Sequence, residues 1–257
     1  MCGRVAQAKN PTEYGSMLKV DFTKGIPNAP AHYNGAPGQD YLIARLQTDS
    51  DDITVDMIRW GLLPPWAKDK KMAWKMINAR AETVATAPAF KKAFEKRRCL
   101  VPVDGFFEWE KVGKERRPYM IAMLDRRPFT LAGLLENRKN PETGEWERTF
   151  TIITTDANEL VAELHDRMPV IIAPEDHERW LKGPDPAELL KPFPADEMTM
   201  WAVSPQLNSP KNDSPDLLDP ISEPRGPSNC GVPRANEGDP ESEPTFGVRV
   251  TSRNFCS

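Results

Sequence analysis

The sequence predicts an α+β fold with a β-rich, barrel-like and largely antiparallel core and helices at its periphery. Nine short runs either alternate apolar and polar residues or are rich in β-branched and aromatic residues, and both patterns are typical of strands. Only four segments have helical character. Nine strands with so few helices between them do not fit repeated βαβ units, so a mainly antiparallel sheet or barrel is favoured.

The predicted elements follow one another over most of the chain. Strands are expected at residues 41–47, 53–60, 99–103, 106–110, 119–124, 129–135, 149–155, 170–173 and 198–203. Helices are expected at residues 11–20, 88–98, 158–165 and 174–181. Pro88 and Pro174 stand near the start of two of these helices, where the first turn tolerates proline.

Proline content marks the expected end of the ordered domain. Thirteen of the 26 prolines fall between Pro184 and Pro244. From Ser222 onward the sequence is polar, carries five prolines and has no apolar periodicity, so it offers too little apolar surface to offset the entropy of ordering. We therefore expect a single domain over residues 2–221 and a disordered tail over residues 222–257.

Composition excludes several classes of protein. No apolar run approaches the roughly 20 residues that a membrane helix needs, and the first ten residues lack the apolar region of a secretory signal. The four cysteines are scattered and no C-x-x-C is present, which argues against a disulfide framework and structural zinc. With 34 Lys and Arg against 38 Asp and Glu, the net charge of −4 gives no general reason to expect nucleic acid. We expect a cytoplasmic globular protein.

One window departs from this acidic average. Between Lys68 and Arg98 there are ten basic residues and three acidic ones, a net charge of +7. The ordinary interpretation is a solvated helix face over residues 91–98. The functional interpretation is a surface that faces phosphates. Trp66 and Trp74 favour the second interpretation, because flat side chains beside cations suit single-stranded nucleic acid.

Cys2 is the most informative position for chemistry. Removal of Met1 would leave cysteine at the N-terminus, with a free amine and a thiol on adjacent carbons. At neutral pH a fraction of the amine is neutral and a smaller fraction of the thiol is thiolate. An aldehyde can form a Schiff base on this nitrogen, and the sulfur can then close a five-membered thiazolidine at high effective molarity. The ordinary interpretation is simply a small residue after the initiator.

Making and breaking such bonds requires acid–base partners, for which Glu108 and His165 are candidates. Glu108 lies in the apolar and aromatic stretch DGFFEWE, which would raise the pKa of its carboxyl and let it donate a proton near neutrality. His165, in ELHDRMPVI, is one of three histidines and follows a predicted helix. Their ordinary alternatives are an edge-strand carboxylate and a histidine favoured by the helix dipole.

Other catalytic signatures have little support. The sequence contains no G-x-x-x-x-G-K-[ST], no G-x-G-x-x-G and no H-E-x-x-H. Asn78 and Arg80, in INARAET, are ordinary residues in isolation. His32 and His177 are expected to be structural, because neither has a chemical partner nearby in the sequence.

Two functions of other classes stay open at this point. Cys2, His165 and Glu108 also fit a thiol peptidase that acts on other proteins, although an internal cysteine would serve that role equally well. The basic window alone would fit a non-catalytic module that binds single-stranded DNA. The placement of the cysteine at position 2 favours amine-plus-thiol chemistry over both.

The motifs, taken together, closely resemble those of the SRAP family (SOS response-associated peptidase), whose members are also known as abasic-site processing proteins. The matching blocks run in family order over nearly all of residues 2–221. They are MCGR at 1–4, HYNGAPGQ at 32–39, RWGLLPPWAKD at 59–69, INARAETVAT at 77–86, RRCLVPVDGFFEWE at 97–110, TFTIITTDAN at 149–158, LHDRMPVII at 164–172 and VSPQLNSPKND at 203–213. The tail after residue 222 matches no family block.

The resemblance implies a mechanism and four catalytic residues. In the family, the exposed N-terminal cysteine captures the ring-opened aldehyde of an abasic site in single-stranded DNA as a thiazolidine, and the strand is preserved. Carried over by motif, Cys2 is the nucleophile and Asn78 orients the N-terminus or the sugar. Glu108 is the general acid/base, both in release of Met1 and in reversal of the adduct. His165 assists the opening of the sugar ring by proton transfer.

The resemblance also implies how the DNA is held. The implied DNA-binding residues are Arg4, Pro37, Trp66, Arg80, Thr154 and Arg167. The arginines are matched to phosphates, whose oxygens fit the guanidinium fork, while Trp66 stacks on a base and Pro37 lies in a loop that wedges strands apart.

The function implied is a covalent DNA–protein crosslink that shields abasic sites from strand cleavage during DNA repair. The expected partner is single-stranded DNA that contains abasic sites, bound by a monomer that needs no metal or organic cofactor and no membrane. In the cell it would be cytoplasmic and associated with the nucleoid when bound to DNA. Because the whole chain is acidic, its DNA affinity should rest on one basic face and fall steeply with salt.

Overall fold

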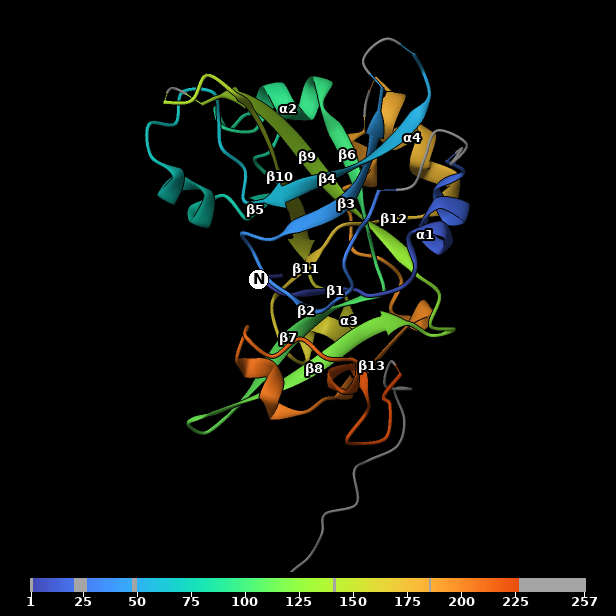
Figure 1. Cartoon of the computed structure of the whole chain (residues 1–257). Helices are drawn as coiled ribbons and strands as arrows, with labels where there is room; N and C mark the ends of the chain where they lie inside the picture. Colours follow the sequence, from blue (N-terminus) through green and yellow to red (C-terminus); the bar gives the residue numbers. More distant parts are fainter. Residues whose placement is uncertain (1, 21–26, 48–49, 141, 185, 227–257) are drawn as a thin grey trace, which may run out of the picture.

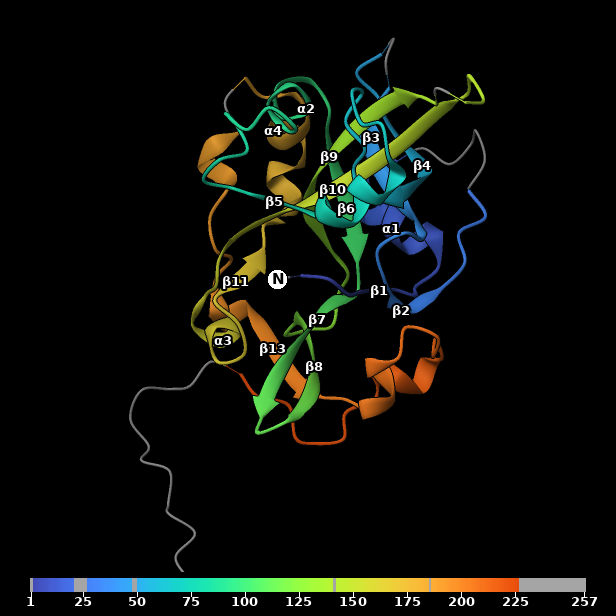
Figure 2. The same ribbon diagram turned by 90° about the vertical axis from the view of Figure 1, so that its left-hand side faces the viewer.

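The computed structural model describes residues 2–20, 27–47, 50–140, 142–184 and 186–226. These residues form two β-sheets with short helices around them, so the predicted β-rich α+β class is confirmed. Figures 1 and 2 show the larger sheet on one side of strand β1 (Val5–Gln7) and most of the smaller sheet on the other side.

Five strands of the larger sheet form a closed ring. Strand β3 pairs antiparallel with β4 and β6, β6 pairs with β9, and β9 pairs with β10. A parallel pairing of β4 with β10 closes the ring over Thr149–Arg59 and Phe150–Trp60. The ring strands are β3 (Asp40–Leu46), β4 (Ile53–Trp60), β6 (Arg98–Val103), β9 (Phe129–Lys139) and β10 (Trp146–Asp156). The prediction of a barrel-like, largely antiparallel core is therefore confirmed.

Three short strands extend the larger sheet beyond the ring. Strand β5 pairs parallel with β10, β11 pairs antiparallel with β10, and β12 pairs antiparallel with β9. Their bounds are β5 (Asn78–Arg80), β11 (Arg167–Pro169) and β12 (Ile171–Ile172). Strands β5 and β11 thus bring two distant segments to the same end of β10.

The smaller sheet has the order β13-β8-β7-β1-β2 and is antiparallel throughout. Its remaining strands are β2 (His32–Gly35), β7 (Gly105–Val112), β8 (Glu115–Met123) and β13 (Met198–Ala202). Strand β1 lies between β7 and β2, so the start of the chain is held on both sides by hydrogen-bonded neighbours.

Aromatic packing fills the interior of the ring. The rings of Trp60 and Phe150 stack with centroids 6.2 Å apart and planes 14° apart, and the ring of Tyr41 meets both edge-on. This arrangement combines a large buried apolar area with the ring geometries that aromatic pairs prefer. The stack also joins the two strands of the parallel seam, because Trp60 and Phe150 are paired there.

The helices lie outside the sheets and are shorter than predicted. They are α1 (Pro11–Leu18), α2 (Lys91–Lys96), α3 (Glu159–Ala162) and α4 (His177–Lys182), with a 3₁₀ turn η3 (Pro174–Asp176) before α4. Helix α1 begins at a capping box in which the Asn10 side chain accepts from the Thr12 backbone N–H and Glu13 reaches back to the Asn10 N–H. Each of the four predicted helices is present.

All nine predicted strands are present, and four further strands are not among them. These four, β1, β2, β5 and β11, have three or four residues each. Runs so short cannot display a two-residue alternation, and their pairing with neighbouring strands, not their own pattern, defines them.

The predicted tail falls mostly outside the described residues, namely at residues 227–257. Its first residues contact the domain: Met200 and Arg225 exchange backbone hydrogen bonds of 2.9 and 2.6 Å, and the Ile221 N–H donates to Ala202 O. Contacts with β13 therefore extend past the predicted boundary at residue 221. Within the part of the chain that the structure describes, no helix has the length and apolar character to span a bilayer.

Candidate active site at the junction of the two sheets

Cys2 lies three residues before β1, the strand between the larger sheet and most of the smaller one, and it is fully buried. Antiparallel pairing of β1 with β7 aligns Val5 with Phe106. The Phe107 N–H donates to Arg4 O at 3.0 Å, which continues that pairing toward the chain start. The alignment places Cys2 and Gly3 alongside the stretch of β7 that carries Glu108.

Glu108 is a buried carboxyl on β7, with 3% of its surface exposed. Alternation along the strand gives it the face of Phe106, which packs into the main apolar core. Burial raises the pKa of Glu108 to about 7, against a lowering contribution from the positive charge of the amino terminus. The predicted direction of this shift is confirmed, and a carboxyl with this pKa can both accept and donate a proton near neutral pH.

The environment of the Cys2 thiol keeps it protonated. Burial raises the pKa of Cys2 far above its usual value, and the negative charge of Glu108 raises it further. The amino-terminal charge and the Arg4 backbone N–H act in the opposite direction. A nucleophilic sulfur at this position therefore requires a neighbouring group that takes up its proton.

His165 is the imidazole of the site, and its pKa is lowered from the usual value. It follows α3, and its Nδ1 accepts the backbone N–H of Arg167 at 2.9 Å, which leaves the ring proton on Nε2. Burial and the amino-terminal charge lower the pKa of His165, while Asp166, whose carboxylate is 2.7 Å from Nδ1, raises it. The Nε2–H is thus the group that His165 can offer to a substrate.

The amino-terminal charge contributes to the pKa of Cys2, Glu108 and His165 alike. Among the described residues, the Glu108 charge acts directly on the Cys2 thiol. We refer to Cys2, Glu108, His165 and Asn78 as the junction site.

Asn78 reaches this end of the larger sheet through β5. The pairing of β5 with β10 aligns Asn78 with Ile152 and Arg80 with Thr154, and β11, just after His165, pairs with the other edge of β10. Both polar atoms of the Asn78 carboxamide are buried and have no hydrogen-bond partner among the described residues. A buried amide without partners costs free energy, which marks the position as one prepared for a ligand.

The three predicted phosphate-binding arginines differ in their contacts. Arg4 donates to Asn34 Oδ1 and to Leu207 O, the second at 3.1 Å. The Arg167 guanidinium donates to the carboxylates of Glu82 and Asp156 and to the carbonyl of Thr154. Arg80 is exposed at the end of β5. Any phosphate at Arg167 would therefore have to compete with carboxylates that are already bound.

Pro37 and Trp66 lie on turns, where Pro37 is half-buried and Trp66 is exposed. Pro37 and Gly38 are the central residues of the turn between β2 and β3, and Gly38 has a φ of +86°. Proline followed by a residue with positive φ is the pattern of a type II turn, which fixes the direction of the Pro37 ring. The Trp66 side chain is 56% exposed and lies on the surface, as its predicted stacking role requires.

The scaffold uses several cations of the basic window between Lys68 and Arg98. Arg98 is buried, and its guanidinium donates to the carbonyls of Phe94, Trp180 and Gly183. These carbonyls belong to the C-terminal turns of α2 and α4, so Arg98 joins two helices to β6 and is not part of a solvated or phosphate-facing surface. In the same window, Arg97 pairs with Glu136 and Lys70 with Glu147, each at 2.7 Å.

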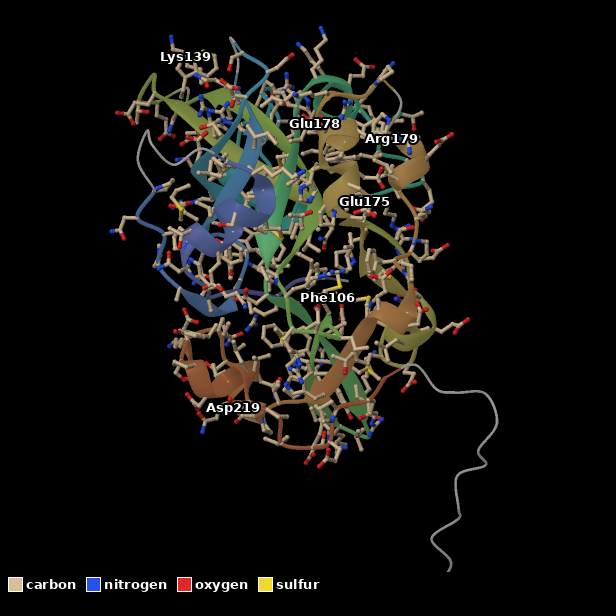
Figure 3. All side chains as sticks on the ribbon, turned by 90° about the vertical axis from the view of Figure 1, so that its right-hand side faces the viewer. Phe106, Lys139, Glu175, Glu178, Arg179 and Asp219 are labelled. Carbon is tan, nitrogen blue, oxygen red and sulfur yellow. The ribbon has the colours of Figure 1, made fainter. Side chains whose placement is uncertain are left out.

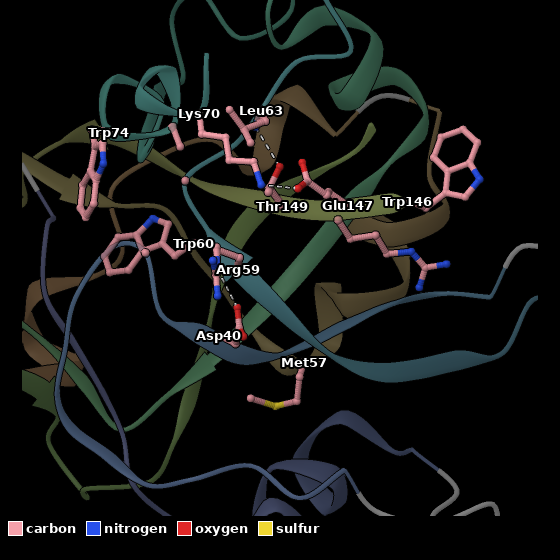
Figure 4. Close-up of a pocket in the computed structure, with 14 residues that line it drawn as sticks. Asp40, Met57, Arg59, Trp60, Leu63, Lys70, Trp74, Trp146, Glu147 and Thr149 are labelled. Atoms are coloured by element: carbon pink, nitrogen blue, oxygen red, sulfur yellow. Dashed lines mark hydrogen bonds and ion pairs between the residues drawn. The ribbon is translucent and has the colours of Figure 1, made fainter. Parts of the chain in front are cut away.

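A groove of about 700 Å³ runs along the outside of the parallel seam (Figure 4). We refer to it as the barrel groove. Trp74 and Trp146 lie at its two ends, and two ion pairs lie between them: Arg59 with Asp40 at 3.1 Å and Lys70 with Glu147. Trp146 belongs to the β9–β10 hairpin and gave no signal in the sequence, because a single exposed tryptophan has no spacing pattern.

Comparison with known proteins yields consistent matches. The family model described as SOS response associated peptidase (SRAP) matches residues 1–210. The chain is 41% identical over 227 residues to the abasic site processing protein YoqW of Bacillus subtilis, covering 85% of this chain and 99% of that protein. It is 32% identical over 231 residues to the abasic site processing protein YedK of Escherichia coli, covering 86% and 100%. A crystal structure of a Bacteroides thetaiotaomicron protein superposes with a TM-score of 0.75 at 28% identity, covering 86% and 100%.

Proposed function

Because the chain belongs to the SOS response-associated peptidase family, we propose that it processes abasic sites in single-stranded DNA by forming a covalent crosslink through Cys2. The observation that carries the proposal is the surroundings of the amino terminus. There the fully buried Cys2 thiol lies within the electrostatic influence of Glu108, a buried carboxyl with a pKa of about 7. The names of relatives that are 32–41% identical support DNA abasic sites as the substrate.

The reaction begins once Met1 has been removed and the Cys2 amine is free. The amine nitrogen attacks the aldehyde carbon of the ring-opened sugar, and one water leaves as the Schiff base forms. The sulfur then bonds to the same carbon, and the thiol proton ends on the nitrogen. The net reaction joins protein and DNA in a thiazolidine with loss of one water, and it removes the iminium that would favour β-elimination and strand cleavage.

The other residues of the junction site supply proton transfers and orientation. Glu108 takes the thiol proton during ring closure and returns a proton when the ring reopens, and it activates the water that releases Met1. His165 donates its Nε2 proton to the sugar oxygen as the ring opens. The carboxamide of Asn78 orients the amine or the sugar, which would satisfy its buried polar atoms.

The DNA strand would be bound as a single strand by a protein monomer, without metal or organic cofactor. Arg4, Arg80 and Arg167 would contact phosphates, with Thr154 beside them at the end of β10, and Trp66 would stack on a base. Within a cell the protein would be cytoplasmic, and associated with the nucleoid while crosslinked.

Mass spectrometry of the intact protein tests the proposal most directly. After incubation with a single strand carrying one abasic site, the expected mass is that of the protein without Met1, plus the strand, minus one water. Cys2→Ala should abolish this adduct. Cys99→Ala is the matched control, because Cys99 is equally buried but lies inside the barrel, and it should leave the adduct intact.

The outcomes separate the functions that the sequence leaves open. An adduct that persists in Cys2→Ala, or that forms on protein retaining Met1, would overturn the proposal. Equal binding of intact and abasic strands with no mass change would indicate a binding module only. Turnover of peptide substrates that depends on Cys2 would indicate a thiol peptidase that acts on other proteins.

A further inference from the structure

A second hollow adjoins the junction site on the smaller sheet. It has a volume of about 520 Å³, and we refer to it as the hairpin pocket because the β7–β8 hairpin supplies half of its lining. Its lining residues are Gly3, Arg4, Trp109, Lys114, Arg116 and Asn208. Gly3 directly follows Cys2, so this pocket begins one residue from the proposed nucleophile.

The wall of the pocket is fixed by hydrogen bonds. The Trp109 indole N–H donates to Asn208 Oδ1 at 2.6 Å, and the Asn208 side-chain amide donates to Arg116 O at 3.2 Å. Asn208 therefore joins both strands of the hairpin to the segment after β13. The Arg4 guanidinium lies 5.6 Å from the centre of the Trp109 ring, which holds that cation in place.

The hairpin directs cations toward the pocket. Cross-strand pairing aligns Lys111 with Arg116 and Trp109 with Pro118, so Arg116 and Trp109 share one face of the sheet. The hairpin turns at Gly113 and Lys114. Gly113 has a φ of +62° and Lys114 has a negative φ, which is the pattern of a type II′ turn. Lys114 thus occupies the tip of the hairpin beside Arg116.

The charge of the pocket is uncompensated. Three of its six lining residues are cationic and none is acidic. Among the described residues, neither the Lys114 ammonium nor the Arg116 guanidinium has an ion pair or hydrogen bond, whereas the cations Arg59 and Lys70 of the barrel groove are both paired with carboxylates. A site that combines unpaired cations with an aromatic wall is complementary to a nucleic-acid backbone, and the barrel groove lacks this charge.

We infer that the hairpin pocket binds phosphates of the DNA strand on one side of the abasic site, with Lys114 and Arg116 as contacts. The inference rests on the proposed function and extends it, because it assigns the path of the strand as it leaves Cys2. Gly3, which has no side chain, lines the pocket between Cys2 and Arg4. The contacts are electrostatic and carry no sequence preference.

The test measures noncovalent binding separately from the crosslink. The probe is a fluorescent single strand with a central tetrahydrofuran abasic analogue, which has no aldehyde, titrated at several salt concentrations. The double variant Lys114→Gln/Arg116→Gln should lower the slope of log affinity against log salt by about 0.7 for each lost phosphate contact, about 1.4 in all. The rate of crosslinking to a true abasic strand should fall at subsaturating DNA and recover as the DNA concentration is raised.

A matched control removes one lysine and one arginine from the opposite end of the molecule. Lys139 on β9 and Arg179 on α4 lie far from Phe106 and the smaller sheet, as Figure 3 shows. Lys139→Gln/Arg179→Gln should leave the salt slope unchanged. An equal loss of slope in this control would show that only net charge matters, and the hairpin pocket would be rejected.

Strands shortened on either side of the analogue complete the test. The double variant should lose its defect only with strands truncated on the side that reaches the pocket. An unchanged salt slope in Lys114→Gln/Arg116→Gln, together with wild-type protein that still crosslinks, would overturn this inference and leave the proposed function standing. Wild-type protein that binds the analogue but never forms the adduct would overturn the proposed function instead.

Discussion

The junction site and the surrounding scaffold use the same residue types in opposite surroundings. In the barrel, the buried Glu136 is held by Arg97 at 2.7 Å and accepts the Asn137 N–H at 3.0 Å. At the junction, the equally buried Glu108 has its pKa raised by burial to about 7, with the amino-terminal charge as the main opposing influence. The scaffold carboxylate is stabilised by a permanent cation, while the protonation of the junction carboxyl depends on a group that changes during the proposed reaction.

The same contrast holds for two asparagines. The Asn34 amide donates to the carbonyls of Leu207, Ser209 and Asn212, and its oxygen accepts from Arg4. The Asn78 carboxamide is buried with no partner among the described residues. Satisfied polar groups hold a fold together, whereas an unsatisfied one costs stability unless a ligand completes it. Variants at Asn34 and Asn78 should therefore separate effects on the free energy of unfolding from effects on the rate of crosslinking.

The largest expected effect is on reversal of the crosslink. Glu108→Gln keeps the shape of the side chain but removes its titratable proton, so we expect release of the DNA to slow by about 100-fold, in the range of general acid–base catalysis. Glu136→Gln should leave release unchanged. The measurement is the decay of purified adduct in the presence of excess competing aldehyde, and equal decay in both variants would refute the role of Glu108.

The next effect concerns stability at the two asparagines. Asn34→Ala should lower the free energy of unfolding by roughly 2–3 kcal/mol, because it leaves buried partners without hydrogen bonds. Asn78→Ala should leave it unchanged or raise it, since the change removes a buried amide without hydrogen-bond partners among the described residues, and yet slow crosslinking by about tenfold. Urea titration and gel-based crosslinking rates measure the two quantities, and a strongly destabilised Asn78→Ala would contradict this comparison.

A third effect is the pH dependence of stability. Burial raises the pKa of Glu108 in the folded protein to about 7, above its unfolded value, so the folded state binds more protons between these values. The stabilising contribution of the protonated form is present below the unfolded pKa and is lost as pH rises through about 7. Relative to Glu108→Gln, wild-type protein should therefore lose about 3 kcal/mol between pH 4.5 and 8. A difference that is constant with pH, or that grows as pH rises, would refute this expectation.

The smallest expected effect concerns the ion pair of Arg59 and Asp40 in the barrel groove. Both side chains are largely exposed, so the pair contributes little. Asp40→Asn should change the free energy of unfolding by less than about 1 kcal/mol and should raise DNA affinity slightly, because it frees a cation. If Asp40→Asn instead raises DNA affinity by as much as Lys114→Gln/Arg116→Gln lowers it, the barrel groove would affect DNA binding as strongly as the hairpin pocket. That result would contradict the distinction between the two.

Local sequence patterns predict much of this molecule, but not its long-range partners. Alternation and β-branched content identify the long strands, and the aromatic neighbours of Glu108 predict the rise of its pKa. Strands such as β5 are too short for a pattern and form because β10 offers an edge. The burial of Arg98 and the carboxylates on Arg167 arise from helices and loops that are distant in sequence, so they follow from topology. The roles of the junction residues stay predictions from family resemblance.

The position of β1 between β2 and β7 has a consequence while the protein is being synthesised. As the chain emerges from the ribosome, β1 appears before both of its neighbours, β2 and β7. Val5 can therefore pair with Phe106 only after β7 has been synthesised. The cysteine beside it is therefore surrounded by its carboxyl and imidazole only after β7 and the segment before β11 have been made. A nascent or misfolded chain would carry the sulfhydryl without the groups that control it, so full reactivity would belong to finished molecules alone.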